Sequence, residues 1–208
     1  MSADIVDAGY LLAFERARRE LQAGRIVGIP TETVYGLAVL PSPEPLARLV
    51  TAKQRSADKG IALLVDSLAQ VKRLAILTPA AELLAQRFWP GALTLVLAQR
   101  PDNPLPELLT GGRPTIGIRL PDHPVPRALA RVLGPLAVSS ANISGQPDST
   151  TAQQVAASVG DEVSLVLDDG PVRGGVPSTV VACPPDGELQ ILRAGAITEA
   201  DVRAVAEK

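Results

Sequence analysis

Cysteine and histidine, the residues that form disulfides, bind zinc and often act in covalent catalysis, are scarce in this sequence. Its 208 residues include one cysteine, Cys183, and one histidine, His123. A single cysteine cannot form an internal disulfide, and with one histidine it cannot assemble a Cys/His zinc site. One histidine also offers only one candidate base for a Ser-His-Asp triad, and no nucleophile elbow accompanies it. The sequence therefore argues against a zinc protein and against a covalent hydrolase.

Aromatic side chains and excess positive charge are also lacking. Phe, Trp and Tyr together make up 2% of the residues, and the formal net charge is −2 at pH 7. Domains that bind nucleic acid usually carry a basic excess, and many provide aromatic platforms on which bases stack. The composition therefore disfavours a protein whose main role is to bind nucleic acid.

Long apolar runs are absent as well. The longest, such as residues 61–65, are far shorter than the roughly 18 residues needed to cross a bilayer. Asp4 and Asp7 stand where a signal peptide would have its basic head. With 46% apolar and 20% charged residues in 208, the composition is that of a globular domain of ordinary size. We expect a cytoplasmic protein without a membrane partner, with one domain over residues 1–208.

Apolar periodicity and turn residues predict helices that alternate with strands. Helices are expected over 11–21, with Gly24 as a stop, and over 43–55, 79–88, 125–133 and 152–159, with a last one capped by Thr198 and Asp201. Strands are expected over 25–30, 61–65, 93–98, 115–120, 136–140, 164–167, 178–182 and 188–192. Residues 101–114, rich in proline, are expected to form an irregular surface loop. This order favours an α/β or α+β fold around a strongly twisted mixed sheet.

Neither common nucleotide-binding motif occurs. The phosphate loop G-x-x-x-x-G-K-[ST] and the dinucleotide fingerprint G-x-G-x-x-G are both missing, so a nucleotide must be held in another way. Lys53, Arg55 and Lys59 lie at the end of a predicted helix, where cations can bind a polyphosphate. The alternative is a solvated helix end whose cations interact with the helix dipole. Spacing alone leaves both interpretations open.

A second candidate follows the predicted strand 136–140. Ligands usually bind at the carboxyl ends of strands in α/β sheets, and Ser140 and Asn142 can offer donors and acceptors there to a phosphate or a base. An ordinary polar turn is the alternative. We interpret Asp168 and Asp169 as part of a turn, because two adjacent acids without partner ligands are a weak metal signal.

Short motifs between about Gly24 and Gly195 occur in a characteristic order. They are PTETVYGL at 30–37, Lys53-x-Arg55, WPGxLT at 89–94, RLPxHP at 119–124, SANxSG at 140–145, STV at 178–180 and LRxG at 192–195. Each motif is weak alone, but the whole set in this order is highly specific. It resembles the YrdC/Sua5 family of threonylcarbamoyl-adenylate synthases, in its short bacterial form.

The resemblance implies a fold and a set of site residues. The fold is YrdC/RibB-like, a twisted mixed sheet flanked by helices around a large open cavity. The implied nucleotide-binding and catalytic residues are Lys53, Arg55, Ser140 and Asn142. Further ATP contacts are implied at Lys59, Thr115 and Arg193, and L-threonine contacts at Thr31, Thr33, Arg119 and Ser178. Mg²⁺ is expected to accompany ATP, and no protein side chain is predicted to bind a metal.

The implied activity is that of a nucleotidyltransferase. L-threonine, bicarbonate and ATP would yield threonylcarbamoyl-AMP and pyrophosphate, for the N6-threonylcarbamoyladenosine modification of tRNA. Such a transfer needs anionic reactants to be positioned and their charge neutralised, which Arg and Lys achieve without a protein nucleophile. The planar fork of Arg119 suits the threonine carboxylate. Downstream tRNA-modifying transferases and weak tRNA binding are implied as partners.

Two other functions stay open on the sequence. A non-catalytic factor that binds tRNA or double-stranded RNA, or matures ribosomes, would use the same concave basic lining, although a net charge of −2 disfavours it. A carbamoyl-handling module of the hydrogenase-maturation type shares the fold by resemblance. That module normally belongs to a longer chain with zinc-finger-like cysteines, and this sequence has only one cysteine. A product that depends on ATP separates the enzyme from the RNA-binding factor.

Overall fold

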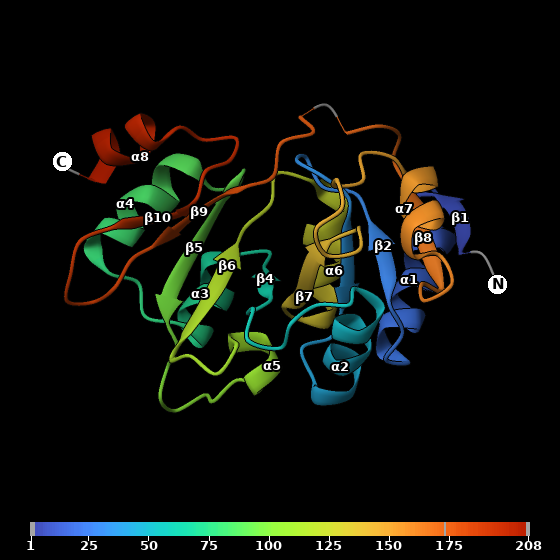
Figure 1. The fold of residues 1–208 in the computed structure, drawn as a ribbon, viewed down its shortest axis with the longest axis horizontal. Coiled ribbons are helices and arrows are strands. Elements are labelled where there is room, and N and C mark those ends of the chain that lie inside the picture. The colour runs from blue at the N-terminus through green and yellow to red at the C-terminus, as the bar shows by residue number, and fades with distance from the viewer. Residues whose placement is uncertain (1–2, 173, 207–208) are drawn as a thin grey trace.

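A ten-stranded mixed sheet forms the framework of the protein (Figure 1). The computed structural model describes residues 3–172 and 174–206. The strands are β1 (Asp4–Asp7), β2 (Val27–Ile29), β3 (Gly36–Val39), β4 (Ala62–Leu64), β5 (Leu93–Ala98), β6 (Thr115–Arg119), β7 (Leu136–Ser140), β8 (Leu165–Asp168), β9 (Thr179–Ala182) and β10 (Gln190–Arg193). They lie in the order β1-β8-β2-β3-β7-β4-β6-β5-β9-β10. Because β4 runs parallel to β6 and antiparallel to β7, the predicted mixed sheet is confirmed.

Helices cover the sheet and bury two apolar clusters against it. They are α1 (Leu11–Gln22), α2 (Pro43–Ala52), α3 (Leu68–Leu74), α4 (Pro79–Phe88), α5 (Glu107–Thr110), α6 (Pro124–Leu133), α7 (Ala152–Val159) and α8 (Glu199–Ala206). Leu21 of α1 and Leu129 of α6 pack in the cluster that includes Leu136 of β7. Leu84 of α4 belongs to the larger cluster with Leu95 of β5. Among the helices described, none is long and apolar enough to span a membrane.

The helix ends follow the signals in the sequence. Thr78 Oγ1 accepts a hydrogen bond from the Ala81 amide at 3.2 Å, which caps α4 at its predicted first turn. Thr198 Oγ1 accepts one from the Asp201 amide at 3.1 Å, as expected for the last helix. Gly24 follows α1 with a φ of +73°, a conformation that glycine adopts without strain. These local predictions are confirmed.

Several short elements were not predicted. The loop expected over 101–114 contains α5, a four-residue helix too short to show a periodic pattern. β1, β3 and α3 were also missed. All four residues of β3 are buried between β2 and β7, so the strand shows no alternation of polar and apolar residues. The helix predicted over 43–55 ends at Ala52, because the chain turns at Gln54 with a φ of +49°.

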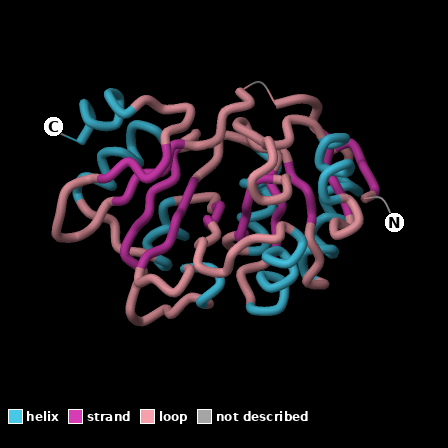
Figure 2. The backbone as a smooth tube through the Cα atoms, viewed as in Figure 1, coloured by secondary structure: helices cyan, strands magenta, loops and turns pink. Residues whose placement is uncertain are grey.

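The longest crossing in the sheet connects β8 to β9. Six strands separate these two in the sheet order, and their connection passes across the top of the view (Figure 2). It carries Ser178 to the start of β9, where β9 pairs in parallel with β5. The crossing thereby brings the C-terminal strands β9 and β10 to the edge of the sheet beside β5.

Candidate functional site

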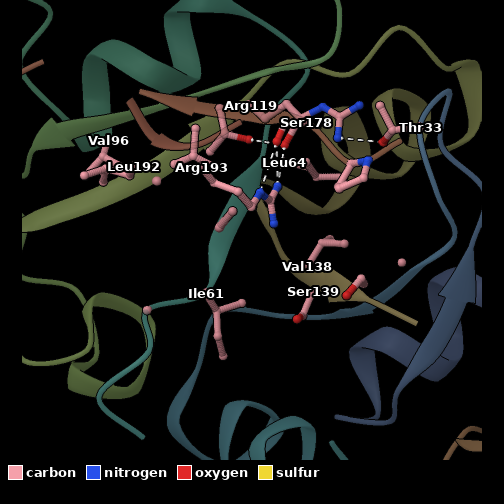
Figure 3. Close-up of a pocket in the computed structure, with 18 of the residues that line it drawn as sticks. Thr33, Ile61, Leu64, Val96, Arg119, Val138, Ser139, Ser178, Leu192 and Arg193 are labelled. Atoms are coloured by element: carbon pink, nitrogen blue, oxygen red, sulfur yellow. Dashed lines mark hydrogen bonds between the residues drawn. The ribbon is translucent and has the colours of Figure 1, made fainter. Parts of the chain in front are cut away.

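A cavity of about 310 Å³ lies against the middle of the sheet. Residues of β3, β7, β4, β6, β5, β9 and β10 line it, and these seven strands are consecutive in the sheet order. Its wall combines apolar side chains, such as Val96 and Val138, with hydroxyl and guanidinium groups (Figure 3). Small-molecule sites typically combine a largely apolar wall with a few placed polar groups.

Most predicted site residues meet at this cavity. Those on its wall are Thr31, Thr33, Arg55, Thr115, Arg119, Ser140, Ser178 and Arg193. On β6, Thr115, Gly117 and Arg119 face the cavity, whereas the alternate residues Ile116 and Ile118 are buried. Three predicted residues are not on the wall, namely Lys53, Lys59 and Asn142.

Arg119, at the end of β6, is held by three groups. Its Nε donates to the carbonyl oxygen of Gly91 at 3.0 Å, and one terminal nitrogen donates to Thr33 Oγ1 at 3.0 Å (Figure 3). Its other terminal nitrogen lies 2.7 Å from Glu32 Oε1, and the Arg119 side chain is only 8% exposed. Gly91 and the adjacent residues Glu32 and Thr33 therefore fix both the plane and the position of the guanidinium from two segments of the chain.

The loop after β2 presents Thr33 to Arg119. Thr31 Oγ1 accepts hydrogen bonds from the amides of Thr33 and Val34 at 3.2 and 3.3 Å, and lies 2.6 Å from the Val34 carbonyl oxygen. Such hydroxyl-to-backbone bonds stabilise a turn. Both threonines are buried, at 4% and 2% exposure. The local turn thus explains why this polar segment directs a hydroxyl into the cavity.

Arg193 and Ser178 form a second polar group on the wall. Arg193 donates from Nε and a terminal nitrogen to the Ser178 carbonyl oxygen at 3.2 and 2.7 Å, and also to Ser178 Oγ at 3.1 Å (Figure 3). Ser178 Oγ is also 2.8 Å from Thr94 Oγ1. A Cβ at Gly195 would come within 2.5 Å of backbone atoms of Pro177 and Ser178, so glycine is required for this close approach. Burial lowers the pKa of Arg193 from its ordinary value.

Arg55 is anchored by backbone carbonyl groups. It donates to the carbonyl oxygens of Lys59 and Gly60 at 3.3 and 2.8 Å. Burial, and then repulsion by Arg193, lower the pKa of Arg55. Within the described part of the chain, Arg55 makes no ion pair. Carbonyl dipoles thus fix Arg55 without cancelling its charge.

Lys53 points away from the cavity wall and into the turn after β7. Its Nζ donates to the carbonyl oxygen of Ser140, to that of Asn142 at 2.5 Å, and to Asn142 Oδ1 at 3.3 Å. Ser140 Oγ donates to Asn142 Oδ1 at 2.6 Å. Burial lowers the pKa of Lys53 to about 8. The ammonium group therefore holds the turn that places Ser140 on the wall.

Two charged residues near the cavity were given no role by sequence reasoning. Glu32 lies in the PTETVYGL motif as its single acid and pairs with Arg119. Arg113 lies on the cavity wall in the loop before β6. A cation just before the alternating strand 115–119 is a weak signal, because the sequence does not show that the loop folds over the cavity. Glu32 is the stronger signal, since a polar loop with one acid often pairs with a cation.

Acidic groups are absent from the cavity wall. Among the residues that line it, none is Asp or Glu. Elsewhere in residues 3–172 and 174–206, no group of three or more His, Cys, Asp or Glu side chains is arranged to hold a metal ion. His123 lies off the wall, where its Nδ1 accepts from the Val125 amide at 3.3 Å and its Nε2 lies 3.1 Å from Asp169 Oδ2. Polar chemistry in the cavity is therefore cationic and hydroxylic.

Comparisons with known proteins agree with this geometry. A family model named Sua5_yciO_yrdC and described as "Telomere recombination" matches residues 19–195. The threonylcarbamoyl-AMP synthase of Bacillus subtilis is 40% identical over 188 residues, covering 89% of this chain and 54% of that protein. A putative threonylcarbamoyl-AMP synthase of Mycobacterium tuberculosis is 41% identical over 163 residues, covering 77% and 74%.

A solved structure agrees in fold as well as sequence. The crystal structure of Pyrococcus abyssi Sua5 complexed with L-threonine has a TM-score of 0.90 and 34% identity, covering 99% of this chain and 61% of that one. The chain spans about half the length of two curated relatives that it matches, 54% of the B. subtilis protein and 48% of one from P. abyssi.

Proposed function

Because the chain belongs to the Sua5/YciO/YrdC family, we propose that it joins L-threonine, bicarbonate and ATP into threonylcarbamoyl-AMP and pyrophosphate. The observation that carries this proposal is the meeting of Arg55, Arg193 and Arg119 with buried hydroxyl groups in one cavity. Two anionic substrates need such a cationic wall. The names of the relatives, and the threonine in the P. abyssi structure, support the same activity.

The triphosphate is assigned to the end of the cavity where Arg55 and Arg193 lie. Both guanidinium groups are fixed by carbonyl oxygens and make no ion pair among the described residues, so their charge is available to phosphate oxygens. Ser140 adds a hydroxyl to the same wall, and Thr115 lies on it too. We assign Lys53 to positioning, because its Nζ holds the turn that carries Ser140 and Asn142.

L-threonine is assigned to the end where Arg119 lies. The planar guanidinium of Arg119 matches a carboxylate, it donates to Thr33 Oγ1 at 3.0 Å, and Thr31 and Ser178 add further hydroxyl groups to the same wall. Lys59 is not on the wall, so its role as an ATP contact stays a prediction.

The proposed reaction needs no protein nucleophile. The threonine amine forms a bond to the bicarbonate carbon with loss of water, which gives a carbamate. A carbamate oxygen then bonds to the α-phosphorus, while the bond from that phosphorus to the bridging oxygen breaks and pyrophosphate leaves with the electron pair. Fixed cations stabilise the charge that develops on the phosphates, because they need no reorganisation during the step.

Mg²⁺ is proposed as the counterion of ATP. Magnesium sites that serve nucleotides commonly use one or two carboxylates together with the substrate phosphates. The cavity wall has no carboxylate among the described residues, so the protein provides no evident ligand. Within this proposal the metal is held by ATP, and no step depends on a protein–metal bond.

The proposal is tested by incubating the protein with ATP, Mg²⁺, L-threonine and labelled bicarbonate. We expect pyrophosphate and an acid-labile labelled adenylate, both of which depend on threonine. RNA affinity that falls steeply with salt, without any ATP-dependent product, would support an RNA-binding factor instead. A cytoplasmic location, tRNA-modifying transferases as partners and weak tRNA binding stay predictions.

A further inference from the structure

The four arginines on the cavity wall differ in how their charge is balanced. Arg119 pairs with Glu32, whereas Arg55, Arg113 and Arg193 make no ion pair within the described residues. We propose that Glu32 determines specificity in this cavity, because it neutralises Arg119 and so excludes polyphosphate from the amino-acid end. Arg119 is then reserved for a ligand with a single carboxylate. The inference rests on the proposed function, since it assigns both substrates to one cavity.

The position of Glu32 fits a role that is exerted through Arg119. Glu32 Oε1 lies 2.7 Å from a terminal nitrogen of Arg119, and the two side chains are 22% and 8% exposed. The same oxygen accepts a hydrogen bond from the Asp122 amide at 3.0 Å, which fixes the carboxylate from a second side. Glu32 is not on the cavity wall. It is therefore a residue that tunes Arg119 rather than one that touches the ligand.

Arg119 keeps donors for a ligand despite this pairing. A guanidinium has five N–H donors, and hydrogen bonds to Gly91 and Thr33 use two of them. The terminal nitrogen beside Glu32 is close enough for an ion pair, but its N–H groups are not aligned for a hydrogen bond. That nitrogen and Glu32 Oε2 are both buried without a hydrogen-bond partner. Buried polar atoms are rarely left unpaired, so Arg119 keeps donor capacity that its pairing with Glu32 does not use.

The arginines lie close enough to one another for this neutralisation to matter. Burial chiefly lowers the pKa of both Arg55 and Arg193; repulsion by Arg193 lowers that of Arg55 further and repulsion by Arg119 that of Arg193, so neighbouring guanidinium groups repel along the wall. Asp148 attracts Arg193, but from beyond ion-pair distance. Without Glu32 the wall would carry an unbroken row of free cations, and a triphosphate could bind at either end. Charge effects of this kind are strong in a partly desolvated cavity.

The experiment titrates the full chain with inorganic tripolyphosphate and L-threonine, by calorimetry without metal. In the wild type we expect one tripolyphosphate site and a threonine affinity that saturating tripolyphosphate does not reduce. In Glu32→Gln we expect a second tripolyphosphate site, and a threonine affinity reduced at least about tenfold by tripolyphosphate. Glu32→Asp keeps the negative charge and should keep a single tripolyphosphate site. A gain of anion binding distinguishes this role from a purely structural one, which could only lose binding.

A matched control is available on α1. Glu20 is 17% exposed and lies 2.7 Å from Arg25 Nε, so its own burial resembles that of Glu32, but its partner Arg25 does not line the cavity as Arg119 does. Glu20→Gln should leave both titrations unchanged. A folded Glu32→Gln protein with one tripolyphosphate site and unaltered competition overturns the proposal.

Failure of this inference is distinguishable from failure of the proposed function. If Glu32→Gln does not fold, the wild type still decides, because displacement of threonine by tripolyphosphate would show that Glu32 does not exclude polyanions. If the wild type binds tripolyphosphate but not threonine, or forms no adenylate, the proposed function fails. The number of tripolyphosphate sites in Glu32→Gln still tests the charge argument in that case.

Discussion

The two ends of the cavity hold arginine in different ways. At one end the Glu32 carboxylate pairs with Arg119, so position and charge are balanced together. At the other end, carbonyl oxygens of Gly60 and Ser178 fix Arg55 and Arg193 while their charge stays uncompensated. A carbonyl dipole orients a guanidinium but does not neutralise it. The same side chain thus has a balanced charge at one end of the wall and a free charge at the other. This difference suits the threonine carboxylate and the triphosphate of the proposed reaction.

The largest effect is expected at the uncompensated end. Arg55→Ala removes a fixed cation that the proposed reaction uses when charge develops on the phosphates, so pyrophosphate release should fall about 10²- to 10³-fold. Initial rates of pyrophosphate formation measure this. The matched control is Arg48→Ala, which removes an exposed arginine of α2 that pairs with Glu44, and it should leave the rate unchanged. Near-normal turnover in Arg55→Ala would remove Arg55 from the site.

The compensated end is tested by Arg119→Lys. Lysine keeps the charge but has one nitrogen, so it cannot reach Gly91, Thr33 and a carboxylate together as the fork does. Loss of charge-assisted hydrogen bonds should raise KM for threonine about 10- to 100-fold, while KM for ATP stays within about twofold. Steady-state kinetics with each substrate varied in turn measure both.

A control for that substitution is Arg16→Lys, at an exposed ion pair with Asp4 of the edge strand β1, which does not line the cavity. It should change neither KM. An Arg119→Lys protein in which KM rises for ATP rather than threonine would reverse the assignment of the two ends.

Lys53 is a third case, because its buried ammonium group donates to carbonyl oxygens of the turn after β7. Its pKa of about 8 in the folded protein lies below the ordinary value of 10.5, chiefly through burial. Between these values the unfolded chain binds a proton that the folded chain has released, so this group makes stability rise with pH. From about pH 7.5 to about pH 10, the free energy of unfolding should rise on the order of 2 kcal/mol more in the wild type than in Lys53→Met.

Chemical denaturation of both proteins at the two pH values measures this difference. Other titrating groups are common to both proteins, so their contributions cancel in the comparison. An identical pH dependence in wild type and Lys53→Met would show that the folded chain does not perturb this ammonium.

The sequence predicted the local structure better than the contacts between distant segments. Helices α4 and α7 and strands β5 and β7 have their predicted bounds, because caps, proline and apolar spacing act within a few residues. The alternation of Thr115, Gly117 and Arg119 also marks a strand with one polar face. Strand β3 was missed because it is buried throughout.

The candidate site depends on pairings that spacing does not encode. Arg119 meets Gly91, just before β5, because β6 pairs with β5, and it meets Glu32 from the loop between β2 and β3; no local pattern determines this strand order. Resemblance to a family brought the motifs together on the sequence, but it did not indicate that Lys53 points into a turn rather than the cavity. Directly after Lys53 the chain turns at Gln54, where φ is +49°, a backbone feature without a sequence signal here.

The smallest effect is expected at Arg113, which lies on the cavity wall but is exposed and forms no ion pair or side-chain hydrogen bond within the described part of the chain. An exposed cation contributes little, because water and salt screen it. Arg113→Ala should therefore weaken ATP binding only about two- to fivefold, and the loss should disappear at high salt. Arg100→Ala removes another exposed arginine, paired with Asp102, and should have no effect at any salt concentration. A loss of ATP affinity in Arg113→Ala that persists at high salt would contradict this expectation. It would show that Arg113, like Arg55, is desolvated against the phosphates, so that the uncompensated end of the cavity includes Arg113 as well.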